Sequence, residues 1–187
     1  MNELNKDIIL KDLPSKRLNL HIYDEIDSTN DEAKRIEGIE DFHIFISEKQ
    51  TKGRGRHGKK WSSPNSGNIY MTISTNQNTS QISPVSLISG LVCKKAIDKL
   101  IKSSSIMLKW PNDILLNDKK IGGILVETET KKENIKTIIG IGINLNISKK
   151  ESWWGDLSAF ALESKRNELI NLIPVSYTHL TLPTSSQ

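Results

Sequence analysis

Short stretches in which apolar and polar residues alternate recur along most of the chain, and this alternation is typical of half-buried β-strands. The strands predicted in this way are residues 18–23, 42–47, 68–75, 106–109, 114–116, 121–127 and 135–147. Strands 114–116 and 121–127 are separated only by the polar turn Asn117-Asp118-Lys119, which predicts a hairpin. Strands joined by short hairpins, with few helices, predict an α+β fold with a mixed, largely antiparallel sheet flanked by helices.

Two segments in the first hundred residues have apolar side chains at helical spacing. The longer covers residues 85–100 and follows Ser83-Pro84, a pair suited to an N-cap and a first helical turn. The shorter covers residues 28–36, where Thr29 and Glu32 have the spacing of a capping box. We expect the longer helix to cover one face of the sheet.

A final helix is predicted over residues 159–173, ending at Pro174 because proline lacks the N–H that a helix interior requires. Residues 174–187 contain no Lys, Arg, Asp or Glu and are rich in Thr, Ser, Pro and Leu. We interpret them as a tail that does not belong to the fold. The sequence therefore predicts one domain over residues 1–173.

Composition and charge narrow the class of protein. A chain of 187 residues with 36% hydrophobic and 26% charged residues is typical of one folded globular domain. The net charge of +4 is too small to indicate nucleic acid as a partner by itself. The single cysteine, Cys93, excludes an internal disulfide and is predicted to be a buried structural thiol. We find neither an apolar stretch of roughly 20 residues nor a signal peptide, so the cytoplasm is the expected location and no membrane is expected as a partner.

The positive charge is concentrated in residues 49–60, which we call the basic loop. This segment has six Lys and Arg residues, no acid, and glycines at Gly53, Gly55 and Gly58. Glycines let backbone N–H groups approach an anion closely, and arginines supply planar donors to phosphate or carboxylate. The basic loop therefore predicts an anion-binding site.

Two familiar phosphate-binding motifs overlap the basic loop but do not fit their context. The glycines match G-x-G-x-x-G, and residues 53–59 match a Walker A motif except that Lys60 replaces the final Ser or Thr. Both motifs require a helix directly after the loop, whereas residues 61–68 are rich in Ser, Asn, Pro and Gly and predict turns. Neither a P-loop NTPase nor a dinucleotide-binding fold is supported.

Five blocks in this order and spacing resemble the biotin–protein ligase family. They are Ser28-Thr29-Asn30; Gln50 with Gly53-Arg54-Gly55-Arg56-His57-Gly58 and Trp61; Lys109-Trp110-Pro111-Asn112-Asp113; Lys120-Ile121-Gly122-Gly123-Ile124-Leu125-Val126-Glu127; and Gly140-Ile141-Gly142-Ile143-Asn144. The resemblance covers about residues 24–147. It implies the class II synthetase-like fold of the biotin and lipoate protein ligases, and an enzyme that adenylates biotin with ATP and Mg²⁺ and then transfers biotin to a lysine of a carrier protein.

The resemblance also implies site residues. Those implied for biotin are Ser28, Thr29, Asn30, Gln50, Gly53, Arg54, Gly55, Arg56, Trp61, Lys120 and Gly122. Those implied for ATP are Arg54, Arg56, Lys59, Lys109, Asn112, Asp113, Lys120 and Asn144. Arg56 and Lys120 are the expected catalytic residues, because preorganised positive charge stabilises the developing charge as pyrophosphate leaves. Asp113 is the candidate magnesium ligand, and the basic loop is the candidate lid over the activated intermediate.

Two features found in some members of the family are not expected in this sequence, and two alternative functions remain open. Only about 20 residues precede the first family strand, so we expect no helix-turn-helix and no DNA partner, and we expect the C-terminal β-barrel of the family to be missing. Trp153 and Trp154 fit an adenine-stacking role and core packing equally well. A lipoate ligase or octanoyltransferase is the nearest alternative enzyme, and a basic nucleic-acid-binding module is the alternative of another class. The expected partner is biotin carboxyl carrier protein, a subunit of acetyl-CoA carboxylase.

Overall fold

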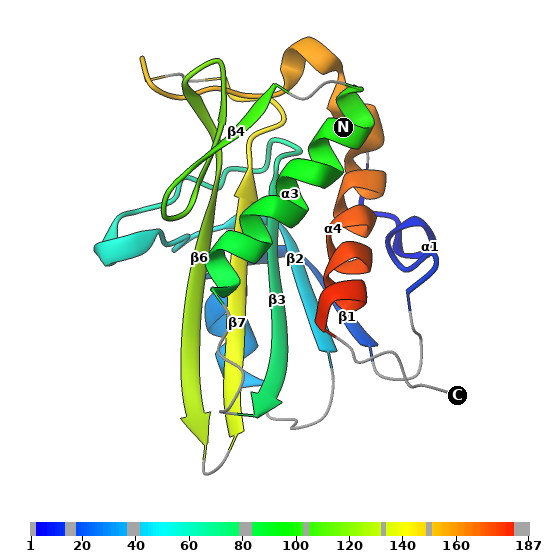
Figure 1. Cartoon of the computed structure of the whole chain (residues 1–187), viewed down its shortest axis with the longest axis vertical. Coiled ribbons are helices and arrows are strands. Elements are labelled where there is room, and N and C mark those ends of the chain that lie inside the picture. The colour runs from blue at the N-terminus through cyan, green and yellow to red at the C-terminus, as the bar shows by residue number, and fades with distance from the viewer. Residues whose placement is uncertain are drawn as a thin grey trace.

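The fold is a seven-stranded sheet with helices on both faces (Figure 1). The computed structural model describes residues 3–13, 18–36, 42–78, 84–102, 105–131, 134–148 and 151–181. The strands are β1 (Leu18–Ile26), β2 (Phe42–Gln50), β3 (Ile69–Asn78), β4 (Ile106–Lys109), β5 (Asp113–Leu116), β6 (Lys119–Lys131) and β7 (Asn134–Ile143). The helices are α1 (Lys6–Ile9), α2 (Thr29–Arg35), α3 (Val85–Ile101) and α4 (Arg166–Thr181), with short 3₁₀ turns η2 (Arg56–Gly58), η4 (Ser158–Phe160) and η5 (Leu162–Lys165).

The strand order is β1-β2-β3-β7-β6-β5-β4, and only the β1–β2 pair is parallel. A parallel pair needs a crossover connection, and here α2 lies in that connection. The remaining neighbours are antiparallel, so the predicted mixed, largely antiparallel sheet is confirmed. β5 and β6 are joined by a two-residue turn in which Asn117 and Asp118 have φ values of 49° and 61°, as a tight hairpin turn requires.

The main hydrophobic core lies between the sheet and the layer formed by α3, α4 and α1 (Figure 1). Strand β7 shows how the sequence builds it: Ile139, Ile141 and Ile143 are buried in this core, whereas the alternating Gly140 and Gly142 face the other side. On that other side α2 covers a second, smaller cluster of Ala33, Phe45 and Ile138. Cys93 is fully buried on α3, and burial raises the pKa of its thiol to about 12, as expected for a structural cysteine.

Two predicted helix boundaries are wrong, and each has a local cause. The last α-helix begins at Arg166 rather than at residue 159, because Ala161 (φ 50°) is left-handed and separates η4 from η5. It also continues through Pro174 to Thr181. Pro174 is buried and Val175 packs against the main core, so burial of apolar area outweighs the helix penalty of ~3 kcal/mol for proline.

The N-cap of α2 also differs from expectation. Ser28, not Thr29, caps α2, and its hydroxyl accepts a hydrogen bond from the Asp31 N–H (3.4 Å). The predicted cap at Ser83 lies outside the described residues. Among the residues that the structure describes, no helix is long and apolar enough to cross a membrane.

Candidate active site

A cavity of about 690 Å³ lies beside the first turn of α2 and brings together side chains that are far apart in the sequence. Its walls come from the start of α2, the end of β2, the basic loop, and strands β3, β6 and β7. The predicted site residues that line it are Ser28, Thr29, Asn30, Gln50, Arg54, Gly55, Arg56, Lys59, Trp61, Asn112, Asp113, Lys120 and Asn144. Five separated sequence blocks therefore meet at one site.

Three predicted site residues lie outside this lining. Gly53 is buried, and a Cβ there would come within 2.5 Å of the Trp61 carbonyl oxygen. Gly122 faces its neighbours in the sheet, because a Cβ there would meet the Gly142 oxygen at 2.8 Å. Lys109 is exposed and borders a second, mainly apolar cavity of about 460 Å³ beside α3. Their predicted ligand contacts stay predictions.

A chain of buried polar groups forms one end of the main cavity. The Gln50 side-chain oxygen accepts hydrogen bonds from the Thr29 N–H (2.9 Å) and the Thr29 hydroxyl (3.1 Å), and the Gln50 amide donates to the Ser63 hydroxyl (2.9 Å). Thr72 bonds both the Thr29 hydroxyl (2.8 Å) and the Asn30 side-chain oxygen (2.6 Å). These contacts fix donors and acceptors in place, which is what a small polar ligand ring requires.

The glycines of β6 and β7 make room for the Trp61 ring in the cavity. A Cβ at Gly142 would meet Trp61 ring atoms at 2.6–2.7 Å, and one at Gly123 would meet them at 3.3 Å. The Lys120 ammonium nitrogen lies 5.6 Å from the centroid of the same ring, within cation–π range. Trp61 therefore forms a flat apolar wall that only glycine permits at position 142.

Replacing Gly142 with alanine is expected to displace the Trp61 ring and lower the free energy of unfolding by about 1–3 kcal/mol, the usual effect of overpacking. Near-ultraviolet circular dichroism and denaturant unfolding measure the two effects. Gly55→Ala is the matched control, because its new Cβ would meet only Lys59 atoms at 3.5 Å or more. An unchanged spectrum in Gly142→Ala would contradict the expected packing of Trp61.

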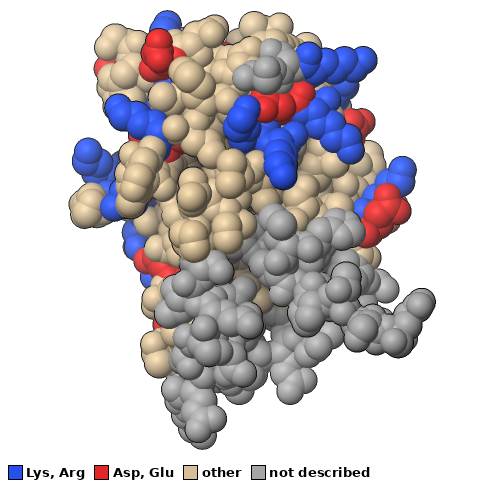
Figure 2. All heavy atoms as spheres, viewed as in Figure 1, with Lys and Arg blue, Asp and Glu red and all other residues tan. Residues whose placement is uncertain are grey.

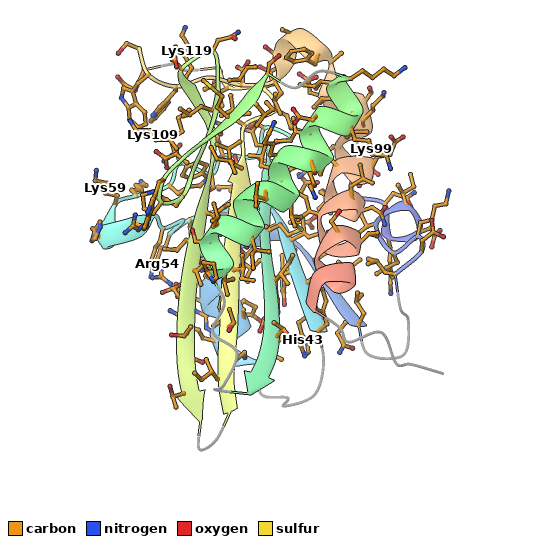
Figure 3. The ribbon with its side chains drawn as sticks, viewed as in Figure 1. His43, Arg54, Lys59, Lys99, Lys109 and Lys119 are labelled. Carbon is orange, nitrogen blue, oxygen red and sulfur yellow. The ribbon has the colours of Figure 1, made fainter. Side chains whose placement is uncertain are left out.

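The basic loop has a definite fold. It leaves and returns to the sheet through the bridges Gln50–Ser63 and Arg54–Lys60, and η2 forms its tip. Figure 2 shows Lys and Arg side chains at the left edge of the molecule, where Figure 1 places this loop. In Figure 3 the Lys59 side chain lies at the loop's outer end, whereas Arg54 lies near the sheet.

Arg54 and Arg56 have different surroundings, although both line the cavity. Arg54 forms ion pairs with Asp31 (2.5 Å) and Glu127 (3.0 Å). Burial lowers the pKa of Arg54, but the hydrogen bonds and charges of Glu127 and Asp31 outweigh this and raise it. Arg56 is exposed, and its guanidinium makes one long contact to the Asn112 side-chain oxygen (3.4 Å). Arg56 is therefore the more available of the two for a ligand anion.

Glu127 on β6 was not among the predicted site residues. Its carboxylate accepts hydrogen bonds from Lys34 (2.8 Å), Asn30 (2.8 Å) and Arg54 (3.1 and 3.0 Å). Burial raises the pKa of Glu127, but these hydrogen bonds outweigh burial and lower it to about 2. Its partners come from α2 and the basic loop, so a pattern along one strand could not indicate this cluster.

The low pKa of Glu127 predicts a loss of stability in acid. The folded-state pKa of about 2 lies below the ordinary glutamate value of 4.5, so the stabilising contribution of Glu127 is present above pH 4.5 and lost as the pH falls towards 2. We expect about 2–3 kcal/mol of the free energy of unfolding to be lost in this window. Denaturant unfolding between pH 6 and pH 2 measures it, and Glu127→Gln should lose correspondingly less over the same range. Parallel pH curves for the two proteins would contradict the assignment to Glu127.

Lys120 reaches the cavity because of an irregularity in β6. The pairing with β5 passes from Gly122 directly to Lys120, which leaves Ile121 as an extra residue in a bulge. Ile121 is buried in the core, whereas Lys120 and Gly123 both line the cavity. The Lys120 ammonium lies 2.6 Å from the Asp113 carboxylate.

Residues 109–113 place two polar side chains at the cavity, as predicted. The Trp110–Pro111 peptide is cis, and Asn112 and Asp113 follow it into the lining. Asn112 is held by its amide, which donates to the Ile124 carbonyl (3.1 Å). Asp113 is already paired with Lys120, and the described residues contain no group of three or more His, Cys, Asp or Glu that could hold a metal. These residues do not form a metal centre by themselves.

Trp153 and Trp154 stand at the rim of the cavity. Trp153 is 56% exposed, so it does not pack in the core, and the two rings are edge-on with centroids 5.4 Å apart. Backbone hydrogen bonds join this segment to Lys120: its N–H donates to Trp153 (2.9 Å) and its carbonyl accepts from Gly155 (2.9 Å). Asn144 is held against the same segment through the Gly155 carbonyl (3.1 Å).

Comparison with known proteins identifies the family of this chain. A family model described as the Biotin/lipoate A/B protein ligase family matches residues 23–144. The bifunctional ligase/repressor BirA of Escherichia coli is 34% identical over 157 residues, covering 79% of this chain and 49% of that protein. Biotin–[acetyl-CoA-carboxylase] ligase of Paracoccus denitrificans is 33% identical, covering 64% of this chain and 51% of that protein. The chain thus spans about half the length of these curated relatives.

Solved structures have the same fold. Biotin protein ligase from Leishmania major in complex with biotin superimposes with a TM-score of 0.70 at 27% identity, covering 86% of this chain and 73% of the other. The Aquifex aeolicus enzyme in complex with biotin and ATP gives a TM-score of 0.65 at 28% identity, covering 86% and 71%. The match over residues 23–144 includes the five sequence blocks between Ser28 and Asn144 that line the cavity, and we conclude that this chain belongs to the biotin/lipoate A/B protein ligase family.

Proposed function

We propose that this protein is a biotin–protein ligase, which converts biotin and ATP to biotinyl-5′-AMP and then transfers biotin to a lysine of a carrier protein. The observation that carries this proposal is that the hydrogen-bonded side chains of Thr29 and Gln50 line the same cavity as Arg56 and Lys120. The names of the relatives support biotin as substrate, and one of the similar solved structures is a complex with biotinyl-5-AMP.

Each end of the cavity suits one part of the proposed reaction. The hydrogen-bonded group of Thr29, Gln50 and Ser63 would face the ureido ring, and the Trp61 ring would contact its apolar surface. Arg56 and Lys120 would lie beside the biotin carboxylate and the α-phosphate. Their charge would offset the repulsion between these anions and stabilise the transition state.

The proposed first step forms a bond between a carboxylate oxygen of biotin and the α-phosphorus of ATP, and breaks the bond from that phosphorus to the bridging oxygen of pyrophosphate. In the second step the ε-amine of the carrier lysine attacks the acyl carbon, AMP leaves, and one proton is released. Magnesium belongs to this proposal only as the companion of ATP, with Asp113 as one ligand beside phosphate oxygens. The carrier subunit of acetyl-CoA carboxylase is the proposed acceptor, and the cytoplasm, where ATP is available, the proposed location.

The test is exchange of labelled pyrophosphate into ATP in the presence of biotin, lipoate or neither. We expect exchange that depends on biotin and saturates with it. Exchange driven by lipoate and not by biotin would instead assign the chain to the lipoate branch of the family. Retention of the protein on DNA without any biotin-dependent exchange would favour the nucleic-acid-binding alternative.

A further inference from the structure

Glu127 joins the two parts of the protein that would face the ligands. It does not line the cavity, and its side chain is 21% exposed. Its carboxylate accepts hydrogen bonds from Asn30 and Lys34 of α2 and from the Arg54 guanidinium of the basic loop. The first turn of α2 and the basic loop are therefore fixed to the same strand by one carboxylate.

The contact with Arg54 has the geometry of a two-pronged ion pair. Nη1 of Arg54 lies 3.1 Å from one Glu127 oxygen, and Nη2 lies 3.0 Å from the other. Nη2 also donates to Asp31 (2.5 Å). The planar guanidinium matches a carboxylate in a way that a lysine ammonium cannot, so this pair fixes direction as well as distance.

Asn30 is committed to the same cluster. Its amide nitrogen donates to Glu127 (2.8 Å), and its oxygen accepts from Thr72 (2.6 Å). Asn30 is only 4% exposed, and a Cβ at Gly140 would come within 2.4 Å of its side-chain oxygen. The carboxylate that holds the loop thus also holds the turn that carries Ser28 and Thr29.

The charge of the basic loop opposes its position against the sheet, and the anchor offsets part of this repulsion. Residues 49–60 include six cations and no acid, so mutual repulsion favours an open arrangement. Glu127 and Asp31 supply negative charge where Arg54 meets the sheet, and Lys59 lies farther out on the loop (Figure 3). Arg56 is separated from Arg54 by Gly55 alone, so the position of Arg56 depends on where the anchor holds Arg54.

We propose that Glu127 is a positioning residue that holds the basic loop against α2 through Arg54 and so places Arg56 over the reacting groups. The part that concerns Arg56 rests on the proposed function. The part that concerns the loop rests only on the contacts of Glu127 and Arg54. The two parts are tested separately.

The loop itself supplies the first readout, because trypsin cleaves after Lys and Arg. In Glu127→Gln and in Arg54→Lys we expect cleavage within residues 49–60 to be about tenfold faster than in the unaltered chain, since cleavage follows the population of the open loop. Mass spectrometry identifies the cleaved bonds. Glu129→Gln is the matched control, with the same substitution two residues along β6, and it should leave the cleavage rate unchanged.

Three outcomes of the proteolysis would overturn the loop anchor. These are unaltered cleavage in both Glu127→Gln and Arg54→Lys, equal acceleration in Glu129→Gln, or a double variant in which the two effects multiply. A shared anchor predicts that the double variant is cleaved no faster than the faster single variant. Arg54→Lys keeps the positive charge, so it remains informative if Glu127→Gln does not fold. This experiment needs no enzyme activity.

The second readout is the rate of biotin-dependent pyrophosphate exchange. We expect Glu127→Gln to reduce kcat about tenfold in the unaltered chain and by less than about twofold in an Arg56→Ala background, because the effect passes through Arg56. Equal losses in the two backgrounds would overturn the link to Arg56. If the unaltered chain shows no exchange with biotin, the proposed function fails, and the proteolysis result still decides the anchor.

Discussion

Replacing Lys120 with alanine is expected to slow biotin-dependent pyrophosphate exchange by about 30-fold to 1,000-fold, which corresponds to about 2–4 kcal/mol in the activation barrier. The Lys120 ammonium lies in the cavity, with the Trp61 ring 5.6 Å away and Asp113 at 2.6 Å. In the proposed reaction this charge meets the negative charge that develops at the α-phosphate. Alanine removes it and also leaves the Asp113 carboxylate without this partner beside two anionic substrates.

Lys119 provides a matched control for this prediction. It is the neighbouring lysine on the same strand, is exposed, and does not line the cavity (Figure 3). Lys119→Ala should change the exchange rate by less than about twofold, since exposed charges contribute little. Biotin binding, measured separately by calorimetry, should be largely kept in Lys120→Ala. Equal losses in the two variants, or a rate within about threefold of the unaltered chain in Lys120→Ala, would contradict the catalytic role of Lys120.

The placement of Lys120 also shows what the sequence could not predict. Alternation along β6 indicates a strand over residues 121–127 but cannot reveal that Ile121 forms a bulge. The bulge turns Lys120 and Gly123 to the cavity, while Gly122 faces the neighbouring strand. Local patterns therefore predicted the element and the residue type, and sheet register decided which glycine lines the cavity.

The hydrophobic and polar pattern of the sequence also could not predict contacts between elements that are distant along the chain. Glu127 is the last residue of a predicted strand, and nothing in its local sequence distinguishes it from other polar strand residues. Its hydrogen-bond partner Asn30 lies 97 residues away. Most of the residues predicted from the family blocks, Gln50 and Asn112 among them, do meet in one cavity. A resemblance thus identified the cavity wall, whereas the groups that hold this wall in place required the fold.

Replacing Arg166 with methionine is expected to lower the free energy of unfolding by about 3–5 kcal/mol, because it leaves a largely buried acid without its partner. Arg166 begins α4 and is 1% exposed. Its Nη1 lies 2.9 and 2.8 Å from the two Glu48 oxygens on β2, and its Nη2 donates to the Asn68 carbonyl (3.0 Å). Asn68 lines the cavity, so this cluster fixes α4 to the back of the site.

Thermal unfolding tests this prediction, with an expected fall in Tm of about 10 °C for a chain of this size. Arg35→Met is the matched control: Arg35 is also paired with acids, Asp27 and Glu32, but it is 52% exposed, so its replacement should leave Tm nearly unchanged. Adding Glu48→Gln to Arg166→Met should recover part of the loss, because the penalty comes from the unpaired charge. If both arginine variants unfold at the same temperature, or if Glu48→Gln deepens the loss by its full single effect, the buried pair is not what joins α4 to the sheet.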